Sequence, residues 1–403
     1  MLCKLSCETA AANALLPRVL LRGSVNYPDM ESIAAALDDL YGVRVEPIIR
    51  KKGELQCVGF YMDFPDDRYI PGDESILEKA ITIVCELLLS PDMENGALRV
   101  DYTESEKSNL VDDIRAAIND KRGYSIDRLL EEMCAGEAFG VSKLGSEGEA
   151  QAITNKSLTM RYNDLIRDSG IEIIYCGSAE PSRVEAAFSS SLGLLPERTD
   201  TEIPKTSVLY EPVIDSIRRF SESLDVSQGK LTVGFRMGGA MKAPDYPAFM
   251  VLNALYGGSV TSKLFLNVRE RLSLCYYASS MIDKHKGVML VASGIEFSKF
   301  DTAFEEILTQ LDNVKKGDIS DWELTSAKRY IVTSVKSALD SPGGLEELYF
   351  DSAVCAVPYD PSMLSNSVEA VTLGRVITAA ADIKPDSVYF LSGKEDREGD
   401  DGA

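Results

Sequence analysis

The pattern of apolar and polar positions predicts a β-hairpin near the start of the chain. β-rich runs at Val45 to Arg50 and Leu55 to Phe64 flank the turn Lys51-Lys52-Gly53. A glycine between two such runs is typical of a hairpin. Apolar residues then recur every three or four positions from Ser75 to Leu89, which predicts an amphipathic helix after the hairpin.

The second half of the chain repeats this order. Leu20 to Val25 recurs as Leu255 to Val260 at an offset of 235 residues. The turn His285-Lys286-Gly287 again lies between extended runs, Cys275 to Ile282 and Val288 to Ile295. Self-similarity at a fixed offset indicates an internal duplication.

Helices follow the hairpin in both halves. They are predicted at about 75–89 and 102–120, then at about 300–314 and 321–339, and the halves end in short β runs at 171–176 and 387–391. Helices that follow hairpins favour an α+β fold over a doubly wound sheet. We predict a first α+β repeat over 1–193, a linker with an edge strand or two over 194–226, a second repeat over 227–392 and a disordered acidic tail over 393–403.

Composition narrows the classes of partner. The 403 residues carry a formal net charge of −22, which repels phosphate backbones and anionic lipid, so nucleic acid and membrane surfaces are poor partners. We see neither an apolar run of membrane-spanning length nor a secretory signal. The eight cysteines are scattered, which favours reduced, buried thiols in a cytoplasmic protein over a cysteine-rich zinc site.

The single histidine, His285, removes several kinds of active site. It excludes Ser-His-Asp and Cys-His mechanisms as well as any zinc site with two histidines. Its place between Lys284 and Lys286 at a hairpin tip predicts a solvated turn residue. The run Gly257-Gly258-Ser259 lacks the lysine of a phosphate-binding loop, and we expect these glycines to end an apolar helix at about 250–256.

Arg269 and Tyr276 are the candidate binding residues. The run SKLFLNVRERLSLCYY at 262–277 predicts a helix that leads directly into a strand. An arginine there can donate hydrogen bonds to a carbonyl or an oxyanion, and a tyrosine hydroxyl can assist. The ordinary alternative is a solvated arginine favoured by the helix dipole, followed by a strand tyrosine. Spacing alone leaves both open.

The run SKLFLNVRERLSLCYYASS at 262–280 resembles the second domain of the insulinase (pitrilysin) family of zinc peptidases, in the mitochondrial-processing-peptidase-like branch. The resemblance extends from about residue 11 to 391 and is most specific at 228–296. It implies a clam-like fold of two homologous domains, each a mostly antiparallel sheet packed by helices.

The resemblance also implies that this chain binds no metal of its own. In the family an H-x-x-E-H helix and a downstream glutamate hold zinc. Here Ala14, Pro17 and Arg18 stand where the motif has His, Glu and His, and none of them can ligate zinc or act as the base. Glu106, near the position of the third ligand, would stand without partners. Because proline disfavours a helix interior, we expect the helix to start at Pro17.

Arg269 and Tyr276 match the family's substrate-holding arginine and tyrosine. The resemblance therefore implies a non-zinc subunit that is inactive alone, binds a peptide or unfolded protein substrate, and completes the site of a zinc-bearing paralogous subunit. It implies no cofactor here, with zinc only in the partner.

Two alternatives remain. One is a non-catalytic binding or scaffold protein, because KLFLNVRE and the run NDKRGYSIDR at 119–128 are similar to bacterial members associated with the aminopentanol modification of elongation factor P. The other is an independent peptidase with an unrelated metal site.

Overall fold

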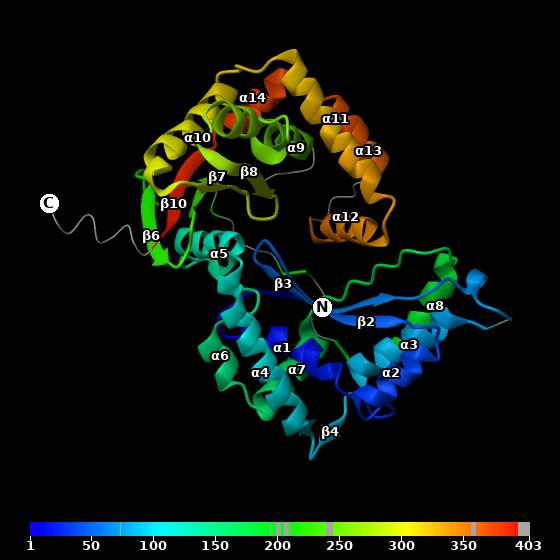
Figure 1. The fold of residues 1–403 in the computed structure, drawn as a ribbon. Helices are drawn as coiled ribbons and strands as arrows, with labels where there is room; N and C mark the ends of the chain where they lie inside the picture. Colours follow the sequence, from blue (N-terminus) through cyan, green and yellow to red (C-terminus); the bar gives the residue numbers. More distant parts are fainter. Residues whose placement is uncertain are drawn as a thin grey trace. The chain divides into compact units, whose positions relative to one another are not determined.

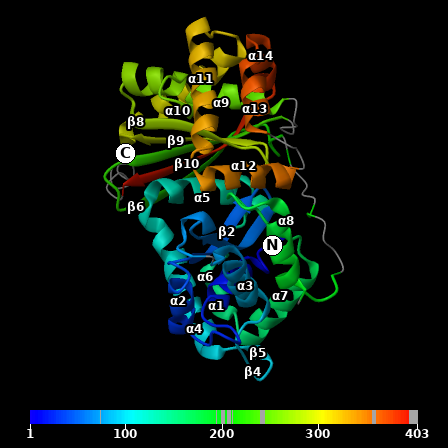
Figure 2. The ribbon, with the colours of Figure 1, turned by 90° about the vertical axis from the view of Figure 1, so that its right-hand side faces the viewer.

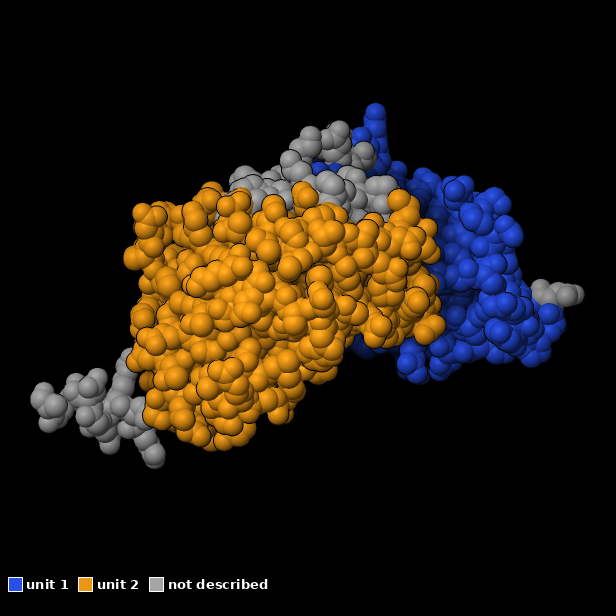
Figure 3. All heavy atoms as spheres, turned by 90° about the horizontal axis from the view of Figure 1, so that it is seen from above, with its two compact units in different colours: residues 1–116, 141–206 blue, residues 117–140, 207–403 orange. Residues whose placement is uncertain are grey.

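The computed structural model describes residues 1–72, 74–193, 195–198, 203–204, 209, 211–238, 245–355 and 360–393. The chain forms two compact units (Figure 3). Unit 1 comprises Met1–Ala116 and Val141–Thr206, and unit 2 comprises Ala117–Gly140 and Ser207–Ala403. The predicted acidic tail lies, apart from Gly393, outside the described residues.

Unit 1 packs helices against a small antiparallel sheet of order β1-β3-β2. The predicted hairpin is confirmed, since Lys52 pairs with Leu55 across a turn in which Gly53 has φ +56°. The elements are β1 (Leu2–Lys4), α1 (Ala10–Leu20), α2 (Met30–Asp38), β2 (Arg44–Lys52), β3 (Leu55–Asp63), α3 (Ile76–Leu89), β4 (Met93–Glu94), β5 (Ala97–Leu98), α4 (Val100–Ala116), α6 (Glu147–Ala152), α7 (Asn155–Asp168) and α8 (Pro181–Leu192).

Unit 2 is built on a five-stranded sheet of order β6-β10-β7-β9-β8. All neighbours are antiparallel except β6 and β10. The strands are β6 (Arg218–Leu224), β7 (Gly229–Arg236), β8 (Cys275–Asp283), β9 (Val288–Ile295) and β10 (Lys384–Gly393). The helices are α5 (Lys121–Met133), α9 (Tyr246–Asn253), the π-helices η4 (Ala254–Gly258) and η5 (Leu264–Arg271), α10 (Phe300–Lys315), α11 (Asp321–Ala338), α12 (Pro342–Cys355), α13 (Pro361–Glu369) and α14 (Leu373–Ala381).

The duplication appears in the order of elements. The hairpin β2–β3 corresponds to β8–β9, α3 corresponds to α10, and α4 corresponds to α11. The predicted α+β fold is therefore confirmed. The predicted strand at 171–176 is wrong: the chain there makes only an isolated bridge from Gly170 to Leu2. Its counterpart β10 is extended because it lies between two strands, β6 and β7.

Residues 117–140 belong to unit 2 although they lie in the first sequence repeat. Figures 1 and 2 show α5 on one side of the large sheet and α9 and α10 on the other. Ser125 of α5 shares a 2.6 Å hydrogen bond with Thr232 of β7. Leu129 packs with Tyr389 and Leu391 of β10. The compact units and the sequence repeats are thus different divisions of the chain.

The cysteines at 3, 7, 57, 85, 134, 176 and 275 are free thiols. Five of them are buried, as expected, but Cys7 and Cys176 are exposed. In the described part of the chain, no helix combines the length and the apolar character needed to cross a bilayer.

Candidate functional site

Helix α1 carries the positions that matched the zinc motif. It runs from Ala10 to Leu20 with Pro17 inside it, so the prediction that the helix starts at Pro17 is wrong. Proline has no N–H, and the carbonyl of Asn13 therefore loses its intrahelical donor. The helix forms nonetheless because nine of its eleven residues are buried, and tertiary packing supplies most helical stability in proteins.

Arg18 pairs with a carboxylate of α4. Its Nη1 donates a 2.7 Å hydrogen bond to Oδ2 of Asp113, and its side chain is only 16% exposed. Ala14 and Pro17 are buried. A fixed guanidinium therefore occupies the α1–α4 contact, and it repels a metal cation. Among the described residues, no group of three or more His, Cys, Asp and Glu side chains is placed to hold a metal.

Glu106 lies two turns before Asp113 on α4 and has partners of its own. Its Oε1 accepts a 3.0 Å hydrogen bond from Nη1 of Arg22, and its Oε2 accepts one from Asn109. The partners of Glu106 are thus an arginine and an amide, and neither of them is a zinc ligand. Two ion pairs join this part of the chain to α4: Arg18–Asp113 from α1 and Arg22–Glu106 from the residues just after it.

Arg269 lies in the last turn of η5. The helix is π-type, with the backbone N–H of Leu272 bonded to the carbonyl of Asn267, and Ser273, two residues beyond its end, has a φ of +49°. The Arg269 guanidinium lies 4.6 Å from the centroid of the Phe265 ring, its Nε lies 3.6 Å from Oε1 of Glu270, and its side chain is 40% exposed. Stacking on an aromatic face preorganises a guanidinium without using its hydrogen-bond donors.

Tyr276 is the extra residue of a β-bulge. Cys275 pairs with Ile295 and Tyr277 pairs with Gly294, so Tyr276 has no partner in the ladder. Its side chain is 66% exposed. Bulges re-aim side chains next to functional sites. The structure thus places Arg269 and Tyr276 at the two ends of one short connection, with side chains that are 40% and 66% exposed.

Gly257 and Gly258 end the helical segment that begins with α9, as predicted. An added Cβ at Gly257 would lie 2.7 Å from the backbone nitrogen of Ser280, and one at Gly258 would lie 2.7 Å from the amide nitrogen of Asn253. Both glycines therefore allow close packing against β8 and against α9 itself.

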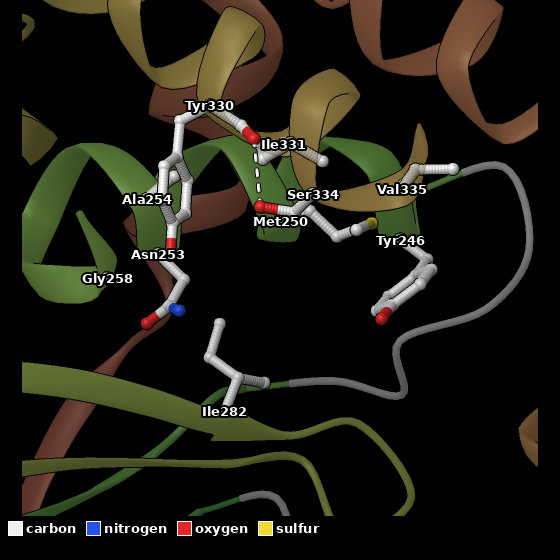
Figure 4. Close-up of a pocket in the computed structure, with 10 residues that line it drawn as sticks. All are labelled: Tyr246, Met250, Asn253, Ala254, Gly258, Ile282, Tyr330, Ile331, Ser334 and Val335. Carbon is white, nitrogen blue, oxygen red and sulfur yellow. Dashed lines mark hydrogen bonds between the residues drawn. The ribbon is translucent and has the colours of Figure 1, made fainter. Parts of the chain in front are cut away.

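A pocket of about 300 Å³ opens in unit 2 between α9, η4, α11 and β8 (Figure 4). Hydrophobic side chains dominate its wall, and its lining residues are Tyr246, Met250, Asn253, Ala254, Gly258, Ile282, Tyr330, Ile331, Ser334 and Val335. Oδ1 of Asn253 accepts a 2.7 Å hydrogen bond from Ser280, which fixes the amide. At the repeat offset of 235, Asn253 corresponds to Arg18. Sequence reasoning missed this pocket, although the small residues Ala254 and Gly258 on the apolar helix were a signal.

His285 lies in the hairpin turn, as predicted, but the prediction that it is solvated is wrong. Its side chain is only 10% exposed, and its Nε2 lies 3.0 Å from Oδ1 of Asp351 in α12. Lys284 pairs with the same carboxylate at 2.7 Å. Helix α12 thus provides the carboxylate that contacts both Lys284 and His285 in the hairpin turn.

Comparison with known proteins places the fold in a family. A family model described as the peptidase M16 inactive domain matches residues 152–331. The chain is 33% identical over 403 residues to the Bacillus subtilis (strain 168) protein "Probable inactive metalloprotease YmfF", covering 98% of this chain and 92% of the relative.

Solved structures support the same family assignment. A conserved protein from Enterococcus faecalis V583 matches with a TM-score of 0.87 at 25% identity, over 98% of this chain and 92% of that one. A peptidase M16 inactive domain from Pseudomonas fluorescens matches with a TM-score of 0.75 at 14% identity, also over 98% and 92%, which shows a shared fold. With the near-full-length match to the B. subtilis relative, these findings show that the chain belongs to the M16 (insulinase) peptidase family, as an inactive metalloprotease homologue.

Proposed function

We propose that this chain is the non-zinc subunit of a two-subunit M16 peptidase. It binds an extended peptide and completes the site of a zinc-bearing paralogous partner. The observation that carries the proposal is the exposed pair Arg269 and Tyr276, one stacked on Phe265 and the other presented by a bulge. Glu270 lies 3.6 Å from Nε of Arg269, so the Nη groups of Arg269 and the hydroxyl of Tyr276 are the donors that would bind a peptide carbonyl or an oxyanion that forms there.

The role of unit 1 in this proposal is structural. Arg18 and Asp113 neutralise each other at 2.7 Å, so this unit needs no metal to keep α1 against α4. Chemistry would then depend on zinc held by the partner. We extend the proposal to a cytoplasmic location, in keeping with the free cysteines. Cell fractionation tests that extension.

The test mixes the purified chain with an M16 paralogue that carries H-x-x-E-H from the same cell and measures cleavage of a quenched peptide. We expect activity from the mixture, lowered about 10²-fold by Arg269→Ala and less by Tyr276→Phe, the range reported for the loss of an oxyanion donor. Arg271→Ala is the matched control, because Arg271 is an exposed arginine on the same helix. Equal losses from both arginine variants, or none from either, would refute the assigned role.

A second candidate function is metal-independent binding of an intact protein. The pocket beside Asn253 favours it, because that pocket lies wholly in unit 2 and needs no zinc partner. Elongation factor P, suggested by the sequence resemblance, is the first protein to try as a ligand. Pull-down of uncleaved elongation factor P without any M16 paralogue would support this function over the first.

A further inference from the structure

Three residues form one row across the sheet of unit 2. Gly294 of β9 pairs with Lys230 of β7 on one side and with Tyr277 of β8 on the other. An added Cβ at Gly294 would lie 2.6 Å from the Tyr277 ring, so the ring lies over the glycine. Lys230 shares a sheet face with Thr232, which contacts α5. The row therefore lies on the face that α5 partly covers.

Two cations flank the Tyr277 ring. The Lys230 ammonium lies 6.0 Å from the ring centroid, and the Arg122 guanidinium at the start of α5 lies 4.7 Å from it. Arg122 is exposed and Lys230 is half-buried. The partly buried tyrosine ring thus forms a platform with two positive charges over it, and the exposed Arg122 lies at its solvent side.

Both cations have only neutral partners among the described residues. Lys230 donates to the amide oxygen of Gln228 at 2.9 Å, and Arg122 donates to the hydroxyl of Ser279 at 2.8 Å. Asp120, the carboxylate nearest to Arg122 in sequence, instead caps α5 by accepting from two backbone N–H groups.

This arrangement differs from the rest of the same sheet face. The buried cations there, Arg236 and Lys286, both pair with the Glu137 carboxylate, at 2.6 and 2.7 Å. The chain has 64 acidic and 42 basic residues, so carboxylates are abundant. Burial also lowers the pKa of Lys230, and an anion beside it would restore the stability of its charged form.

We propose that Lys230 and Arg122, over the Tyr277 platform, form a subsite for a carboxylate of the bound peptide. The carboxylate is either an acidic side chain or the peptide's C-terminus. The subsite follows Tyr276 directly in β8, so it gives the peptide a preferred register. This inference rests on the proposed peptide-binding function and adds a substrate class to it.

The test measures binding of labelled, otherwise neutral peptides to the full chain by fluorescence anisotropy at low salt. One series carries a single Glu at each position in turn, and a matched series carries Gln. A third arm compares the Gln peptide as free acid and as C-terminal amide. We expect one Glu position, or the free acid, to bind roughly three- to tenfold tighter than its neutral counterpart, as for two partly exposed ion pairs. Which arm responds identifies the source of the carboxylate.

Variants assign the effect to the subsite. Lys230→Met and Arg122→Gln should each reduce the ratio of the affinity for the acidic peptide to that for its neutral counterpart. Lys156→Met is the matched control, because Lys156 is an exposed lysine in unit 1, and it should preserve the preference. Circular dichroism checks that each variant folds.

The outcomes separate the two proposals. Equal binding of acidic and neutral peptides overturns the carboxylate subsite and leaves peptide binding standing. A preference that survives both variants also overturns it. Failure of every peptide to bind refutes the proposed function and removes this inference with it.

Discussion

Glu137→Gln tests the buried ionic cluster that attaches residues 117–140 to unit 2. The Glu137 carboxylate accepts hydrogen bonds from Arg236 at 2.6 Å and Lys286 at 2.7 Å, and both cationic side chains are completely buried. Asp386 provides the only other carboxylate partner of Arg236 among the described residues, at 3.1 Å, and it also pairs with Arg218. The variant therefore removes one of the two carboxylates beside Arg236 and the carboxylate that lies 2.7 Å from Lys286.

The expected loss is large because the two cations cannot reach water. Removing one partner of a buried ion pair costs about 3–5 kcal/mol. Glutamine still offers one acceptor oxygen, so we expect unfolding of unit 2 to become easier by about 3 kcal/mol, at the lower end of that range. Glu132→Gln is the control, since Glu132 makes a partly exposed pair with Arg128, and it should cost under ~1 kcal/mol.

Trp322 makes the assay specific to unit 2. It is the only tryptophan of the chain and lies in the first turn of α11. Its fluorescence during guanidinium unfolding of the full chain reports on this unit, and hydrogen exchange of 121–133 reports on α5. If Glu137→Gln unfolds within ~0.5 kcal/mol of the wild type and α5 keeps its protection, the argument that this cluster secures α5 is wrong.

Three further predictions follow from local geometry. Pro17→Ala should stabilise unit 1 by about 1 kcal/mol, because alanine restores the missing helix donor at some cost in packing. Thermal unfolding should therefore show a higher melting temperature for unit 1, and a lower one would contradict this. Gly257→Ala should destabilise unit 2 by at least ~2 kcal/mol, because its Cβ would lie 2.7 Å from a backbone nitrogen of Ser280; wild-type stability in denaturant would refute it. Although burial opposes the shift, hydrogen bonds from Lys263 and Ser320 hold the pKa of Glu323 below its usual value. The stabilisation of the folded state by the Glu323 carboxylate is therefore complete above the unfolded pKa of ~4.3 and is lost as pH falls through the lower folded pKa. Glu323→Gln should thus reduce the loss of folding stability between neutral and acid pH. An unchanged dependence of stability on pH would count against this reasoning.

Much of the fold could be predicted from local sequence. The hairpins depend on β-rich runs around Gly53 and Gly287, and the helices on apolar periodicity, and both signals act over a few residues. The strand predicted at 171–176 was wrong because its neighbours decide whether an apolar run becomes a strand. The same holds for the candidate site. The identities of Ala14 and Pro17 were enough to exclude zinc ligation there, but they could not predict the contacts that these positions make in the fold.

The sequence by itself determined the duplication, the α+β class and the lack of a two-histidine metal site, because repeat, periodicity and residue identity need no knowledge of distant contacts. Only the tertiary structure decided that Arg18 meets Asp113, 95 residues away, that His285 is held by Asp351, 66 residues away, and that α5 joins the second unit. These pairings bury charge and apolar surface between segments far apart in the chain. Their free energy depends on which surfaces meet, and no local pattern records that.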